Sequence, residues 1–172
     1  VVALAAVGFG NVLLWLFARP AGEPAGRFLG ELCGVEAVLL LSCSLVLATV
    51  LPPIERAFGG LDRVAQWPRR VAVTGVVLLV PHLALVTTPL SPYTTTLGQA
   101  LGQVALAGLV FLSLWALAPG LRAPRWPGLI RRLARATYER WLTAHRLAGL
   151  FVAAALVHGA LVDVVLHRST LL

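Results

Sequence analysis

Five long apolar segments, separated by proline-containing links, constrain what this chain can fold into. Residues counted as hydrophobic make up 59% of its 172 residues. An α-helix needs roughly 20 apolar residues to cross a hydrocarbon core of about 30 Å. Helix is the default for each segment, because an isolated strand cannot satisfy its backbone hydrogen bonds in lipid. The sequence therefore predicts an all-α, polytopic transmembrane bundle with five spans, at Val1–Ala18, Phe28–Leu51, Val71–Leu90, Leu97–Leu117 and Trp141–Leu166.

The positive charge of the chain comes from arginine alone and gathers in two of the four links. The positive-inside rule places these two links in the cytoplasm, and the N-terminus with them. We therefore expect a multi-pass protein of a bacterial plasma membrane, with the lipid bilayer as its surroundings and no nucleic-acid partner. The second link contains Arg56, Arg63, Arg69 and Arg70, and the fourth contains Arg122, Arg125, Arg131, Arg132, Arg135 and Arg140.

Two further features of the links concern the membrane surface. The stretch LIRRLARATYERW, residues 129–141, fits either an amphipathic helix on the inner surface or a basic solvated loop. Tryptophans lie mostly near span ends, as interfacial anchors do. They are Trp15, Trp67, Trp115, Trp126 and Trp141.

Two histidines occupy matching depths in the third and fifth segments. His82 follows Arg70 by twelve residues, and His158 follows Arg146 by twelve. At 1.5 Å per residue, each imidazole lies about 18 Å from the arginine that marks the inner edge of its helix. Two parallel helices would thus present two neutral imidazoles at one level, the arrangement that a bis-histidine haem requires. The alternative is that each histidine hydrogen-bonds a neighbouring helix.

The other two histidines fit this site less well. His145 precedes His158 by thirteen residues, or about 20 Å along a helix, and is rotated from it by roughly 140°. At the depth of His145 the third segment offers Pro68, Arg69 or Arg70, none of which can replace a histidine ligand. His167 is expected in an exposed outer loop.

Several other polar residues leave two interpretations open. Glu31, Glu36 and Asp163 would form an acidic approach for a metal ion or proton. The alternative is that Glu31 lies at the headgroup level and that Glu36 forms a hydrogen bond inside the bundle. Arg69, Arg70 and Arg146 either neutralise haem propionates or anchor the inner boundary. Gln99 and Gln103 are expected to support helix packing.

At three stretches the chain resembles the ferric reductase-like transmembrane domain. They are FLGELCGVEAVLLL running on to LVLATVLPPIERAFGGLDRV, the third segment around His82, and YERWLTAHRLAGLFVAAALVHGALV with His145 and His158. That family includes ferric-chelate reductases, NADPH oxidases and the haem-bearing membrane subunit of a methionine sulfoxide repair system. The resemblance implies haem b held by His82 and His158 as axial ligands of an outer haem, with His145 as half of an inner pair.

The resemblance fails at one ligand position. The family's inner histidine on the third helix would fall at Pro68, so one haem is expected rather than two. Reductase members continue into a sixth helix and a cytoplasmic module that binds FAD and NAD(P)H, and neither lies within these residues. The chain starts without methionine and stops where another segment could begin, so we expect residues 1–172 to be one domain of a longer protein.

The expected function is that of a membrane b-type cytochrome within an oxidoreductase. It would pass electrons from a cytoplasmic flavin reductase module, in cis or in trans, to an acceptor such as ferric iron or oxygen. One alternative is a non-enzymatic electron-carrier subunit for a separate partner, and another is a haem-less helical scaffold or transporter. No catalytic residue is predicted, because the sequence contains no nucleophilic triad, zinc-ligand cluster or nucleotide-binding glycine motif.

Overall fold

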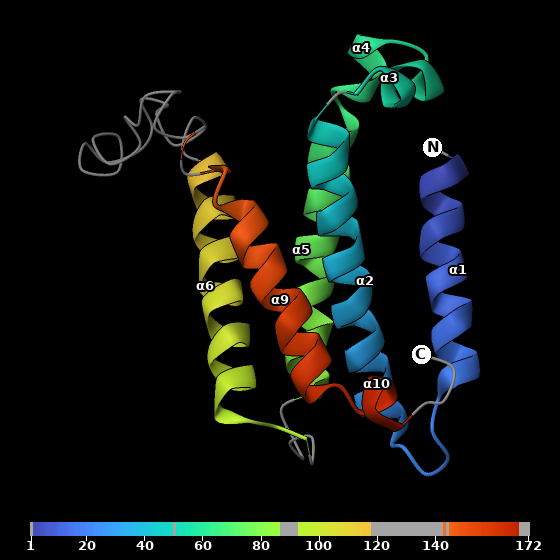
Figure 1. The fold of residues 1–172 in the computed structure, drawn as a ribbon, viewed down its shortest axis with the longest axis vertical. Helices are drawn as coiled ribbons and strands as arrows, with labels where there is room; N and C mark the ends of the chain where they lie inside the picture. Colours follow the sequence, from blue (N-terminus) through green and yellow to red (C-terminus); the bar gives the residue numbers. More distant parts are fainter. Residues whose placement is uncertain (1, 50, 87–92, 118–142, 144, 169–172) are drawn as a thin grey trace, which may run out of the picture.

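A computed structural model describes residues 2–49, 51–86, 93–117, 143 and 145–168, and every regular element within them is a helix (Figure 1). The predicted all-α class is therefore confirmed. The helices are α1 (Val2–Ala18), α2 (Ala25–Ala48), α3 (Pro52–Phe58), α4 (Leu61–Val64), α5 (Trp67–Val86), α6 (Thr96–Leu117), α9 (Ala148–Val162) and α10 (Val164–Arg168).

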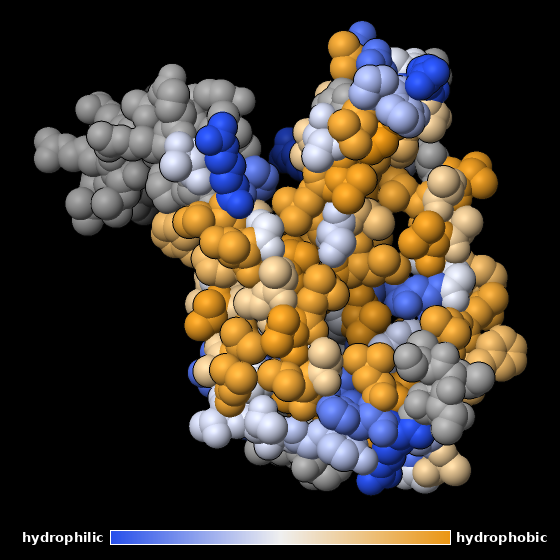
Figure 2. Space-filling view, viewed as in Figure 1, coloured by the Kyte–Doolittle hydropathy of each residue, from blue (hydrophilic) through white to orange (hydrophobic). Residues whose placement is uncertain are grey.

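Three of these helices are long and apolar enough to cross a membrane: α2, α5 and, over Thr96–Leu114, α6. In the space-filling view apolar side chains cover the middle of the molecule and hydrophilic ones gather at its two ends (Figure 2). These features indicate a membrane protein. Five spans are not confirmed, because α1 and α9 have only 17 and 15 residues.

The long helices alternate in direction, so that α5 and α9 run the same way (Figure 1). α2 packs along α5, and α6 packs along α9. The two pairs meet in an apolar cluster of buried side chains from α2, α6 and α9, namely Leu41, Leu109 and Val152. One end of the bundle carries α3 and α4, and the other carries α10; we call them the α3–α4 end and the α10 end.

The fifth predicted segment, Trp141–Leu166, is not one continuous helix. α9 ends at Val162, and Asp163 adopts extended angles, φ −74° and ψ 129°. The Asp163 side chain explains the break, because its Oδ1 accepts a hydrogen bond from the backbone N–H of Leu166 at 3.1 Å and so caps α10. α10 then turns back, and Val165 packs against Trp15, Ala18 and Phe28.

The second link is also more ordered than a loop. Pro52 and Pro53 occupy the first turn of α3, where their missing N–H groups cost nothing. Gly59 and Gly60, at φ 77° and 115°, then separate α3 from α4. The fourth-link arginines and the stretch 129–141, predicted as a surface helix or loop, lie outside the described residues.

Candidate functional site

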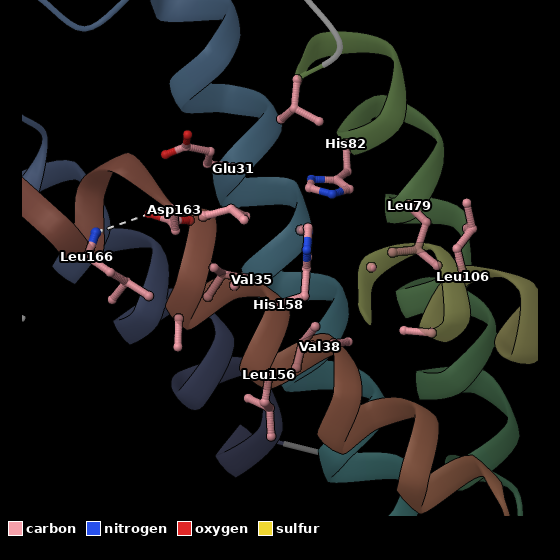
Figure 3. Close-up of a pocket in the computed structure, with 18 of the residues that line it drawn as sticks. Glu31, Val35, Val38, Leu79, His82, Leu106, Leu156, His158, Asp163 and Leu166 are labelled. Atoms are coloured by element: carbon pink, nitrogen blue, oxygen red, sulfur yellow. Dashed lines mark hydrogen bonds between the residues drawn. The ribbon is translucent and has the colours of Figure 1, made fainter. Parts of the chain in front are cut away.

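A cavity of about 750 Å³ lies between the helices, on the α10 side of the apolar cluster. Its volume is within the range of small-molecule and cofactor sites. Residues of α1, α2, α5, α6, α9 and α10 line it, and most of their side chains are apolar. Val35, Val38, Leu79, Leu106 and Leu156 are among those visible in Figure 3.

His82 enters this cavity from α5 and rests on the backbone of α2. Its Nδ1 lies 2.9 Å from the carbonyl oxygen of Gly30. One turn further along α2, a Cβ added to Gly34 would lie 2.5 Å from the same nitrogen. Only glycine leaves the ring enough room at that position.

His158 enters the same cavity from α9 and rests on α6 in the same way. Its Nδ1 lies 2.7 Å from the carbonyl oxygen of Gly98, and a Cβ added to Gly102 would lie 2.7 Å from that nitrogen. Each histidine therefore lies against two glycines four residues apart on the neighbouring helix. We call these two arrangements the His82 seat (Gly30, Gly34) and the His158 seat (Gly98, Gly102).

The seats determine which ring nitrogen is available for chemistry. A backbone carbonyl only accepts, so each Nδ1 carries the proton and donates it to the carbonyl. Nε2 then keeps its lone pair, and within the described residues neither His82 nor His158 has a partner at this atom. A second hydrogen bond of this kind fixes the ring orientation of histidines that ligate metals. Both rings are directed to one apolar space (Figure 3).

The remaining histidines lie elsewhere. His145 is exposed, lies before α9 and does not line the cavity. Pro68 lies in the first turn of α5, where its carbonyl accepts a hydrogen bond from the Ser44 hydroxyl at 2.8 Å. His167 is exposed, as predicted, but it lies in α10 and not in a loop, and its ring stacks on Tyr93 at 4.3 Å. Among the described residues, no group of three or more His, Cys, Asp or Glu side chains could hold a bare metal ion.

Arg27 is a wall residue that sequence reasoning missed. It lies in the first turn of α2, is 8% exposed and lines the cavity. Its Nη2 has no hydrogen-bond partner among the described residues. A buried N–H donor without a partner is costly, so this atom favours an anionic group in the cavity. Arg69, Arg70 and Arg146, the arginines considered from sequence, are exposed and do not line it.

The acidic residues singled out from the sequence are buried in the bundle or form hydrogen bonds inside it. Glu31 is 7% exposed and lines the cavity, and Asp163 is 5% exposed beside it. Glu36 hydrogen-bonds inside the bundle, because its Oε1 accepts from Asn11 Nδ2 of α1 at 2.8 Å. Gln99 and Gln103, predicted to support helix packing, line the cavity.

Comparisons with protein-family models, with curated proteins and with solved structures find no match to this chain.

Proposed function

We propose that the cavity holds one b-type haem, with His82 and His158 as its axial ligands. The observation that carries this proposal is the pair of seats. Two imidazoles from different helices line one cavity, and each donates Nδ1–H to a backbone carbonyl and keeps Nε2 for a ligand. Neutral imidazole is the usual protein ligand of haem iron in an electron carrier.

The rest of the cavity suits the same group. Its apolar walls match the faces of a porphyrin and exclude water from the two imidazoles. The unpaired Nη2 of Arg27 suits a propionate, since guanidinium pairs strongly with carboxylate. When bound, the haem supplies an iron that carries one electron at a time.

The proposed activity is electron transfer through the bilayer, as the membrane part of an oxidoreductase like those of the ferric reductase-like family. The α3–α4 end, with its exposed arginines, would face the cytoplasm together with the N-terminus. A flavin module using FAD and NAD(P)H would deliver electrons at that end. The acceptor, ferric iron or oxygen, would be reached from the α10 end, which lies closer to the cavity.

The absorption spectrum of the purified protein, loaded with haemin in detergent, tests this proposal. We expect one haem per chain and a low-spin bis-histidine spectrum in both redox states. His82→Ala and His158→Ala should each lose that spectrum. His145→Ala is the matched control, because His145 is exposed and outside the cavity, and it should keep the full haem content. A bis-histidine spectrum that survives His82→Ala, or a haem content halved by His145→Ala, contradicts the proposal.

A further inference from the structure

Four buried ionisable side chains gather at the α10 end of the bundle. They are 5–8% exposed and comprise three carboxyl groups and one guanidinium, namely Glu23, Glu31, Asp163 and Arg27. Three of them, Arg27, Glu31 and Asp163, line the cavity that both histidines enter. The acidic groups thus outnumber the basic one at the wall of the proposed haem site.

Two of these carboxyl groups meet directly. Glu31 Oε2 accepts a hydrogen bond from the backbone N–H of Val164 at 3.3 Å, which holds it at the break between α9 and α10. Asp163 forms that break, and its carboxyl lies within hydrogen-bonding reach of Glu31. In Figure 3 both side chains lie on the same side of the cavity. We call Glu31 and Asp163 the carboxyl pair.

Two side chains near the pair keep buried polar atoms without a geometric hydrogen bond in the described part of the chain. Both side-chain oxygens of Glu23 and Nη2 of Arg27 are buried without a partner among the described residues. Two adjacent carboxylates in a poorly solvated site cannot both ionise at low cost. Consistent with this, burial raises the pKa of Asp163 to about 6, and burial also raises the pKa of Glu23.

We infer that the carboxyl pair shares one proton in the cavity wall and takes up a proton from solution at the α10 end when an electron enters the cavity. The electron adds one negative charge to the cavity ligand, and the only bond formed is an O–H bond on a carboxylate oxygen of the pair. This inference rests on the proposed haem, since that group receives the electron.

The other charged and titratable groups near the pair do not supply this proton. The guanidinium groups of Arg27, Arg19 and Arg168 donate hydrogen bonds and have no atom that accepts a proton. The hydroxyl of Tyr93 accepts a hydrogen bond from Arg168, and Tyr93 does not line the cavity. His82 and His158 donate Nδ1–H to carbonyls and would use Nε2 on the iron. The carboxyl of Glu23 also lies within hydrogen-bonding reach of Glu31, but Glu23 does not line the cavity.

A redox titration of the haem-loaded protein between pH 5 and 8, with dithionite as the reductant, tests the inference. A proton linked to each electron lowers the midpoint potential by up to about 59 mV per pH unit. Glu31→Gln and Asp163→Asn should both flatten this dependence, and asparagine keeps the cap of α10. Glu36→Gln, which changes the carboxyl bound to Asn11, should leave the dependence unchanged. A flat wild-type profile, or one that Glu36→Gln flattens and the pair variants do not, overturns the inference.

Infrared spectroscopy separates this inference from the proposed function. In the haem-free protein at pH 6, the shared proton should give a carbonyl band of a protonated carboxyl, which Glu31→Gln and Asp163→Asn weaken and Glu36→Gln does not. If no haem binds, the proposed function fails and the redox linkage fails with it, while the band still decides whether the pair holds a proton. If haem binds and the band is missing, only the inference fails.

Discussion

A methyl group added at either seat provides a sharp test of how the histidines are held. In Gly34→Ala the new Cβ would lie 2.5 Å from His82 Nδ1, and in Gly102→Ala it would lie 2.7 Å from His158 Nδ1. Each ring must therefore move, which breaks its hydrogen bond to the carbonyl of Gly30 or Gly98. The backbone of the seat helix cannot yield as a flexible side chain would.

The size of the effect follows from the contacts that are lost. A buried hydrogen bond contributes about 1 kcal/mol net, and a buried donor left without a partner costs about 1–3 kcal/mol. Overpacking by one methyl group costs about 1–3 kcal/mol more if the ring cannot adapt. For a ligating histidine, loss of its outer hydrogen bond weakens metal binding roughly 10–100-fold. We therefore expect haem affinity to fall by roughly that factor in each variant.

Haem titration followed by absorbance measures this affinity directly, with Gly149→Ala as the matched control. Gly149 lies on α9, and a Cβ added there meets nothing within 4 Å. The control should bind haem as the wild type does, and it should gain up to about 1 kcal/mol of helix propensity. Wild-type affinity in both Gly34→Ala and Gly102→Ala would refute the argument that the seats position the imidazoles.

Three further predictions concern the cavity wall and the bundle. Burial raises the pKa of Asp163 from 3.8 to about 6, so the folded protein binds a proton at this carboxyl more tightly than the unfolded chain does. The stability that this group contributes is full below about pH 4 and is lost as the pH rises through 6. Asp163→Asn should therefore reduce the fall in melting temperature between pH 4 and 7. Asn11→Leu leaves the Glu36 carboxyl without its partner and should lower unfolding stability by about 1–3 kcal/mol, measured by denaturant titration; an unchanged midpoint would show that the bond is not needed. Arg27→Gln should weaken haem binding while Arg146→Gln, on an exposed residue, should not; equal affinities would exclude Arg27 as an anion partner.

The sequence predicts the helices and the depth of the two imidazoles because both depend on local periodicity. A helix rises by a fixed amount per residue, so equal spacing from Arg70 and Arg146 suffices to align His82 with His158. The structure brings both to one cavity by this means. Their Nδ1 partners on α2 and α6 were not predictable, since which glycine faces which ring depends on how the helices pack.

The features missed from sequence depend on contacts between distant segments. Trp15 lies near a span end and reads as an interfacial anchor, yet it is 2% exposed because α10 folds back over it. The position of α10 depends on the helix break at Asp163. An apolar segment with a single acidic residue does not predict such a break. An arginine in a link between two apolar segments is expected at the surface. Arg27 is instead buried at the α10 end of the bundle, because segments distant in sequence pack around it.

The expectation of one haem rather than two has a structural counterpart in the α3–α4 half of the bundle. There the apolar cluster of Leu41, Leu109 and Val152 lies between the helix pairs, with Ala72 and Val76 of α5 packed against it. Leu109 also lines the cavity, so the cluster forms its floor. A second porphyrin on that side would have to displace these side chains, besides lacking a ligand at Pro68. If the cavity holds a haem as proposed, we therefore expect that restoring a ligand at Pro68 alone would not add a second one.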